Sequence, residues 1–454
     1  NVNGNYTQNG GTLTSATTGT SISLNVTGTF NQSAGTISQS STGSLAIGFN
    51  GSVVKAVTLS GTNTTGKINY TINNGNGNGI TLAGTLNING GATLTTSIGG
   101  TSVTGGTVSY AATGALIYNA ATATQAAGDE WPAVNGPTSV TINNTHTTPD
   151  VSLSASRTLS GTLTLTAGRI LLGANDLTLA NGGTLTVTTP GATKMIVTDG
   201  AGLFKRGIPA TTGTYLFPIG ETTGVTQYSP VTLQFTANST VRVIGAKVID
   251  ASSANLSTPA APTNYLSRYW TFSEDGAGGT YNYYINPAIA ITGAEDENGT
   301  AANIKAAYWN GSAWTVSTGT YSAGSMVSNA SGVSETAAPL GTVEWTGRDN
   351  PPVSYVWNGT TSNDFNTATN WTPNGIPIGS DNITINIAVP NPCVINSGSF
   401  SISNATISGT GDFQMAAATS FTVLGDITYT ASVLPTLNCS STVAFSKLGA
   451  LTIP

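Results

Sequence analysis

Charged residues, histidine and cysteine are scarce in this chain of 454 residues. Asp, Glu, Lys and Arg make up 7% of it, whereas a soluble globular protein carries about 25%. The 13 basic and 19 acidic residues give a net charge of −6, so no basic surface can form to hold nucleic-acid phosphates. No apolar run reaches the roughly 18 residues that a membrane span needs. We therefore predict that the chain binds no nucleic acid and does not span a membrane.

Helix-forming segments are also missing, because no Leu/Ala/Glu/Lys-rich stretch repeats its apolar residues with a period of 3.6. Disorder is disfavoured, since a disordered chain is rich in charge and poor in β-branched residues. Short alternations of Thr, Val, Ile and Leu, separated by Gly and Asn, fill the sequence instead. They predict an all-β protein.

A motif repeats in the N-terminal part with a step of about 24 residues. Val2, Gly4, Tyr6, Gln8, Gly11 and Leu13 recur as Val26, Gly28, Phe30, Gln32, Gly35 and Ile37. The same frame returns at Leu82 and Leu159, and in part at Val423. Three short strands per period are typical of a right-handed parallel β-solenoid (β-helix), which we predict for residues 1–201, with Val2, Val26, Leu82 and Leu159 facing inward. The alternative is an antiparallel sandwich with strands of similar length.

Residues 202–350 differ in composition from the preceding part of the chain: charged residues are more frequent, aromatic residues cluster and the sequence repeat is absent. Strands are expected at 231–235, 241–248, 281–285, 304–309 and 341–345, a spacing that favours an immunoglobulin-like β-sandwich. The aromatic residues, among them Trp270 and Trp309, are expected to form its core rather than a ligand platform. Residues 351–454 then hold a lead-in segment and a second, truncated β-solenoid, because the sequence from Ile383 to Val394 matches that from Val140 to Val151.

Several phrases resemble the repeating extracellular modules of secreted surface adhesins of the Bacteroidota type. They are Tyr215 to Gly220, Tyr228 to Val231, Tyr269 to Phe272, Trp309 to Trp314, Trp357 to Trp371, and Leu116 to Asn119 leading to Trp131. The resemblance covers nearly the whole chain, but its motifs are structural and not catalytic. It implies a location at the bacterial cell surface, export by type IX secretion and a role in adhesion or gliding. The family's C-terminal sorting domain is not visible in this sequence.

The chain contains too few candidate catalytic side chains to assemble an active site. Asp129 and Glu130 are the first carboxylates in the chain, so the acidic clusters of solenoid glycosidases and lyases cannot form before them. The only histidine, His146, lies near Asp150, and a Ser-His-Asp triad is formally possible. A solvent-facing loop residue is the interpretation that we favour, because no G-x-S-x-G turn has a convincing context. We therefore predict that the chain is not an enzyme.

Calcium is the one cofactor that the sequence suggests, through the acidic run Glu295, Asp296, Glu297 and Asn298. Oxygen ligands in a tight loop can bind Ca²⁺, yet the full 12-residue calcium-loop pattern is missing, which favours a solvated loop. Cys393 and Cys439 have no C-x-x-C or His partner, so a zinc site is excluded. About two solenoid periods separate them, roughly 10 Å of stacking, which favours buried free thiols unless an irregular coil brings them closer.

Three functions remain open. The leading one is a structural or adhesive segment of a long surface fibre that binds glycans or surfaces by many weak contacts and works with the secretion and motility machinery of the outer membrane. The others are a carbohydrate-processing β-helix enzyme whose active part lies outside this segment, and a pure spacer stalk. Because Asn1 lies inside the repeat and no polar cap follows Phe445, we also expect the parent chain to continue in both directions.

Overall fold

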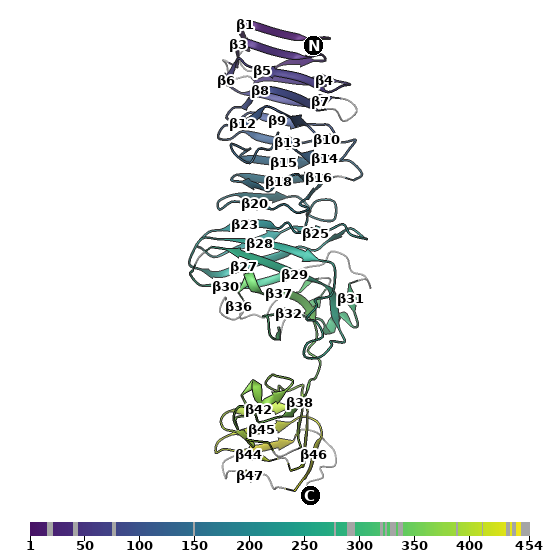
Figure 1. The fold of residues 1–454 in the computed structure, drawn as a ribbon, viewed down its shortest axis with the longest axis vertical. Coiled ribbons are helices and arrows are strands. Elements are labelled where there is room, and N and C mark those ends of the chain that lie inside the picture. Colours follow the sequence, from purple (N-terminus) through teal and green to yellow (C-terminus); the bar gives the residue numbers. More distant parts are fainter. Residues whose placement is uncertain are drawn as a thin grey trace. The chain divides into compact units, whose positions relative to one another are not determined.

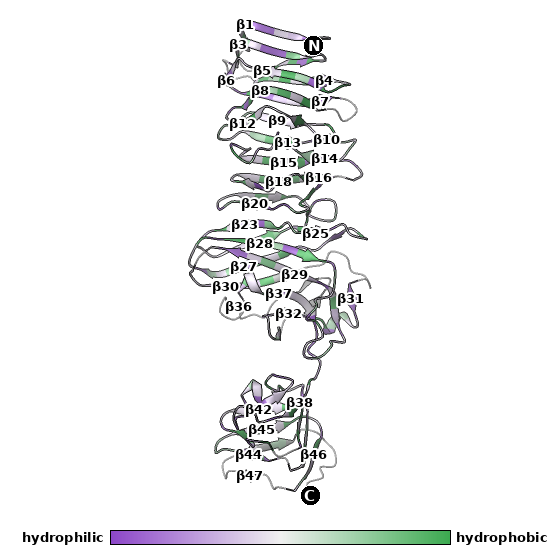
Figure 2. Cartoon of the chain, viewed as in Figure 1, coloured by the Kyte–Doolittle hydropathy of each residue, from purple (hydrophilic) through white to green (hydrophobic). Residues whose placement is uncertain are grey.

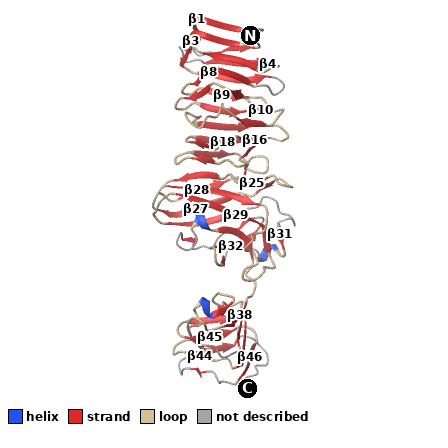
Figure 3. Ribbon diagram, viewed as in Figure 1, coloured by secondary structure: helices blue, strands red, loops and turns tan. Residues whose placement is uncertain are grey.

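The computed structural model is all-β, with short 3₁₀ turns between its strands (Figure 3). It describes residues 1–454 except 16–20, 40–43, 75–78, 149, 277, 288–295, 318–320, 323–324, 327–332, 335–338, 387–388, 411, 433–435, 438–441 and 446–454. The 3₁₀ turns are η2 (Ala301–Asn303), η3 (Leu340–Thr342) and η4 (Ala368–Asn370). Among the described residues, no helix is long and apolar enough to cross a membrane. The chain divides into two compact units, residues 1–253 with 266–347 and residues 254–265 with 348–454.

The first unit contains a parallel β-solenoid, and its strands stack as successive rungs (Figure 1). One sheet runs through β2 (Ser21–Val26), β4 (Ser44–Gly51), β7 (Ile68–Asn74), β9 (Thr93–Thr96), β13 (Ala115–Tyr118), β15 (Ser139–Asn143), β18 (Thr162–Ala167) and β21 (Thr184–Val187). A second joins β1 (Tyr6–Ser15), β3 (Phe30–Gln39), β5 (Lys55–Leu59), β8 (Ile80–Ile88) and β11 (Val103–Thr104), with β6 (Thr62–Thr65) and β12 (Thr107–Tyr110) beside it. A third runs through β10 (Gly100–Thr101), β14 (Gln125–Ala127), β16 (Asp150–Leu153), β19 (Arg169–Leu171), β22 (Ile196–Val197), β25 (Ile219–Glu221) and β26 (Gln227–Tyr228).

The stacking register confirms the repeat that the sequence predicts. Val2 bridges Val26, and strand β1 pairs with β3 so that Tyr6 faces Phe30, each partner lying one period further along the chain. Val26, Leu82 and Leu159 are buried, as expected, and Val2 packs partly buried against the same core. Buried and less buried side chains alternate along β13 and β18, because successive side chains of a strand point to opposite faces. Figure 2 shows hydrophobic (green) and hydrophilic (purple) residues interspersed along the stacked strands.

The glutamine of the repeat is buried and forms hydrogen bonds inside the coil. The Gln8 carboxamide donates to the carbonyl of Gly11 at 3.3 Å and to that of Thr36 in the next coil at 3.2 Å. Gln32 repeats this arrangement one coil later, with Gly35 and Thr62 as acceptors at 3.3 Å. The strand bulges after Gln8, and Gly11 has a φ of 69°, a conformation that glycine adopts without steric cost. The spacing Gln-x-x-Gly therefore encodes a bulge whose carbonyls are satisfied inside the coil.

The last coils pass directly into antiparallel structure. Strand β17 (Arg157–Leu159) pairs in parallel with β20 (Leu177–Leu179), and β20 with β23 (Phe204–Ile208), but β23 pairs antiparallel with β28 (Arg242–Ile249). The same sheet continues through β29 (Tyr265–Asp275), β37 (Glu344–Arg348), β32 (Lys305–Trp309) and β33 (Trp314–Val316), with β31 (Glu297–Asn298) at its side. Hydrogen bonding thus continues from the solenoid into the segment expected to be a sandwich.

A second antiparallel sheet packs against this layer. It comprises β24 (Gly213–Phe217), β27 (Val231–Asn238), β30 (Tyr281–Pro287) and β36 (Val333–Ser334), and a short hairpin joins β34 (Tyr321–Ser322) to β35 (Ser325–Met326). Tyr283 of β30 packs edge-on against Trp345 of β37, with 6.3 Å between ring centroids. Trp270 and Trp309 are buried, as expected of core aromatics. The five expected strands overlap β27, β28, β30, β32 and β37, although residues 341–343 precede β37. Strands β24 and β29 of the same antiparallel sheets lie outside the predicted ranges, and an immunoglobulin-like sandwich that alternates with solenoids is not confirmed.

The second unit forms another parallel coil. Its first sheet comprises β39 (Trp371–Thr372), β38 (Ser354–Trp357), β40 (Asn382–Ile385), β43 (Asn404–Gly409) and β46 (Ile427–Ala431). The second comprises β41 (Cys393–Ile395), β44 (Phe413–Met415) and β47 (Thr436–Leu437). The third comprises β42 (Ser399–Ile402), β45 (Ser420–Val423) and β48 (Thr442–Phe445). Strand β38 pairs antiparallel with β39 and in parallel with β40, so the lead-in segment forms the first layer of this coil. Trp357, Phe365 and Trp371 pack edge to face in its core.

Candidate functional site

A loop between β14 and β15 is held on its inner side by a buried acid. Glu130 is fully buried, and its carboxylate accepts hydrogen bonds from the Tyr118 hydroxyl and the Gly128 backbone N–H, both at 2.8 Å. The Tyr110 hydroxyl donates to the Glu130 carbonyl at 2.6 Å. Trp131 is also fully buried, with its ring 6.2 Å from that of Tyr118. Burial raises the pKa of Glu130, because a carboxylate loses its hydration there. The base of the loop is thus fixed by packing and hydrogen bonds.

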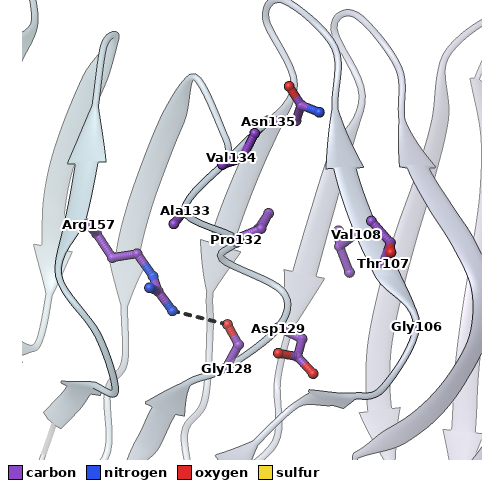
Figure 4. Close-up of a pocket in the computed structure, with 10 residues that line it drawn as sticks. All are labelled: Gly106, Thr107, Val108, Gly128, Asp129, Pro132, Ala133, Val134, Asn135 and Arg157. Atoms are coloured by element: carbon purple, nitrogen blue, oxygen red, sulfur yellow. Dashed lines mark hydrogen bonds between the residues drawn. The ribbon is translucent and has the colours of Figure 1, made fainter.

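The outer side of this loop borders a cavity of about 340 Å³ (Figure 4). Its walls come from the residues around the start of β12, from the loop itself and from the first residue of β17. The lining includes Thr107, Val108, Asp129, Pro132, Val134, Asn135 and Arg157. Val134 is 76% exposed and contributes an apolar side chain to this lining. The cavity therefore combines polar and charged groups with a few apolar side chains.

Two charged residues stand at this pocket. Arg157 is 8% exposed, and its guanidinium donates to the Gly128 carbonyl at 3.5 Å and to the Ser156 carbonyl at 3.3 Å. Both bonds are long. Its Nε is buried without a hydrogen-bond partner among the described residues and is out of reach of a ligand, but each Nη nitrogen carries a second N–H. The exposed Asp129 accepts a hydrogen bond from the Gly105 backbone N–H at 3.0 Å through Oδ2. Donor capacity on Arg157 and acceptor capacity on Asp129 are thus left for a ligand.

A second group of charges surrounds Arg268, which is fully buried in β29. Among the described residues, its Nη2 lies near carboxylate oxygens of Asp250 at 3.0 Å, Asp296 at 3.3 Å and Glu221 at 3.6 Å. Its Nη1 donates to the hydroxyl of Ser229. Burial, and then the charge of Asp250, raise the pKa of Glu221 to about 7. A single guanidinium therefore holds together acids from β25, from the end of β28 and from the turn before β31.

The residues predicted to bind calcium are divided by the structure. Asp296 is 3% exposed and pairs with Arg268, so its carboxylate already faces a cation that the chain supplies. Glu297 and Asn298 form β31, and Glu295 lies outside the described residues. In the part of the chain that the structure describes, no group of three or more His, Cys, Asp or Glu side chains is arranged to hold a metal ion.

His146 and Asp150 are close in sequence but do not form a catalytic pair. The Nδ1 atom of His146 accepts a hydrogen bond from the Thr148 backbone N–H at 3.1 Å, while Asp150 forms an ion pair with Arg169 at 2.6 Å. Cys393 is fully buried and forms no disulfide with any residue that the structure describes, and burial raises its pKa well above the usual value. Cys439 lies outside the described residues, so the pairing of the two cysteines stays a prediction.

Sequence reasoning did not find the pocket or the Arg268 group. One signal was present, because Asp129 and Glu130 are the first acids of a chain whose preceding coils contain none, and a charged pair there marks a special position. Arg157 lies further along the sequence, and no pattern indicates that it is beside them. Comparison of the chain with protein-family models, with curated proteins and with solved structures gives no match.

Proposed function

We propose that the chain is a structural and adhesive segment of a long bacterial surface fibre, exported by type IX secretion and presented outside the cell. One observation carries this proposal: the coils stack one on another from β1 into the antiparallel sheets, over one hydrophobic core that extends from Val26 to Trp345. Each coil is bonded to the next by backbone ladders, so tension along the stack is shared by many hydrogen bonds. Such a body suits the transmission of force.

The outer faces support a role in weak, repeated contacts. In the sheet of β9 to β21, the outward positions hold Thr95, Thr141, Thr164 and Thr186 in register, with Ile117 between the first two. A neighbouring column brings the hydroxyls of Thr162 and Thr184 within 2.8 Å. These hydroxyls repeat at the strand spacing of about 4.8 Å, and each can donate and accept hydrogen bonds. Many such contacts along one fibre give adhesion through avidity rather than through one strong site.

The proposal is tested by adhesion under load. Beads carrying the purified chain are brought to glycan-coated surfaces and to the outer surface of bacterial cells, and the detachment force is measured. Multiple rupture events on either surface, lost when the chain is unfolded by denaturant, are expected. A chain that resists unfolding by force but adheres to neither surface would contradict the adhesive role and leave a spacer. Release of sugar products from a polysaccharide would instead establish the enzyme.

A further inference from the structure

The pocket beside Asp129 and Arg157 has the size of a small-ligand site. Its volume of about 340 Å³ is at the lower end of the roughly 300–1,000 Å³ that such pockets occupy. The loop between β14 and β15, which lines the pocket, does not need to become ordered on binding, since Glu130 and Trp131 fix it from inside the coil. A ligand therefore meets a site that loses little conformational freedom when it binds.

The charges at the pocket select for a neutral ligand. An anion would approach Arg157 but would also meet the carboxylate of Asp129, and a cation would meet the reverse arrangement. A group that donates to Asp129 and accepts from Arg157 satisfies both. Hydroxyl groups do this, because each carries one donor hydrogen and two acceptor lone pairs. A ligand with several hydroxyls on one rigid frame can bind both side chains at once.

The apolar part of the lining completes the match. Val134 is 76% exposed, and Pro132 and Val108 line the same pocket (Figure 4). A sugar ring offers a C–H face to such residues while its hydroxyls point to the rim. We propose that this pocket binds one neutral sugar residue of a glycan, with Asp129 as acceptor, Arg157 as donor and Val134 against the ring. The assignment rests on the adhesive role for its biological setting.

The test uses the full chain and a panel of neutral monosaccharides and short neutral oligosaccharides, with a uronic acid and inorganic phosphate as charged probes. Binding is followed by ligand-observed NMR and calorimetry. We expect a neutral sugar to bind, and Asp129→Ala and Val134→Asp each to weaken it by at least about tenfold. Val53→Asp is the matched control, because Val53 is 63% exposed and lies outside the pocket lining. Melting temperatures equal to that of the wild type show that the variants are folded.

Several outcomes would overturn the assignment: no neutral sugar bound, preference for the uronic acid or phosphate, or equal binding by wild type and both pocket variants. These outcomes are distinguishable from failure of the adhesive role. If beads carrying the variants adhere to cells as strongly as the wild type, the adhesive role stands and the pocket does not serve it. If wild-type beads do not adhere while the sugar still binds in the pocket, the adhesive role fails and the site remains.

Discussion

The carboxylate of Glu221 lies 3.6 Å from the guanidinium of Arg268, and the two side chains expose 3% and 0% of their surface. Arg268 also pairs with Asp250 and Asp296, so its single charge does not neutralise all three acids. Ionisation of Glu221 is therefore opposed by burial and by the neighbouring negative charge, which is why its pKa rises from 4.5 to about 7.

This shift predicts that Glu221 destabilises the fold at high pH. The folded chain binds the proton more tightly than the unfolded chain, so stability is lost as pH rises from about 4.5 to about 7. Glu221→Gln keeps the neutral form, and we expect its unfolding free energy to exceed that of the wild type increasingly between about pH 5 and pH 8, by up to about 2 kcal/mol. Denaturant unfolding at a series of pH values measures the difference. Asp275→Asn is the control, because its carboxylate is 62% exposed. A constant difference across this pH range would contradict the prediction.

Asp296 is expected to stabilise the protein without calcium. Asp296→Asn removes one carboxylate from buried Arg268 and should lower the melting temperature equally in EDTA and in excess Ca²⁺. The wild type should melt at the same temperature in both conditions. A rise with Ca²⁺ that disappears in Asp296→Asn would show instead that this carboxylate binds the ion.

The core of the solenoid can be probed with neighbouring residues of β18. Leu163 is fully buried and Thr164 points outward, since adjacent strand residues face opposite sides. Leu163→Ala should cost about 2–5 kcal/mol of unfolding free energy, because it leaves a cavity between stacked coils. Thr164→Ala should change stability by about 0.5 kcal/mol or less. Denaturant unfolding measures both, and a larger loss for Thr164→Ala than for Leu163→Ala would mean that the strand has the opposite orientation.

Tryptophan quenching tests the burial of the aromatic residues. Trp270 and Trp345 are fully buried, whereas Trp314 is only half-buried. Acrylamide should therefore quench little of the native fluorescence, and Trp314→Phe should remove most of the quenchable part. Trp345→Phe should leave the quenchable part unchanged. If Trp270 proved readily quenched, the packing of β29 would be wrong.

Cys393 reports on the second unit. Because its thiol is fully buried and its pKa is raised, a thiol reagent should modify it only when this unit opens. In a Cys439→Ser variant, the native protein should react at least about 100-fold more slowly than the protein unfolded in denaturant. Comparable rates in the two states would show that Cys393 is exposed.

The sequence by itself determined the β class and the coil register. The repeat from Val2 to Val26 and the alternation around Leu163 are local patterns, and stacking in a parallel solenoid adds each coil to the previous one in the same frame. Gln8 and Gly11 belong to the same local code, because their hydrogen bond closes within one bulge.

Only the tertiary structure decided where the isolated charges meet. Arg157 reaches the Gly128 carbonyl, and Arg268 collects Glu221, Asp250 and Asp296, across separations that no period relates. The continuation of β23 into β28 was equally hidden, because a strand's sequence shows which face is buried but not which edge its neighbour will pair with. Pairings of this kind depend on how the chain returns to a sheet edge, and that is fixed by the packing of the whole unit.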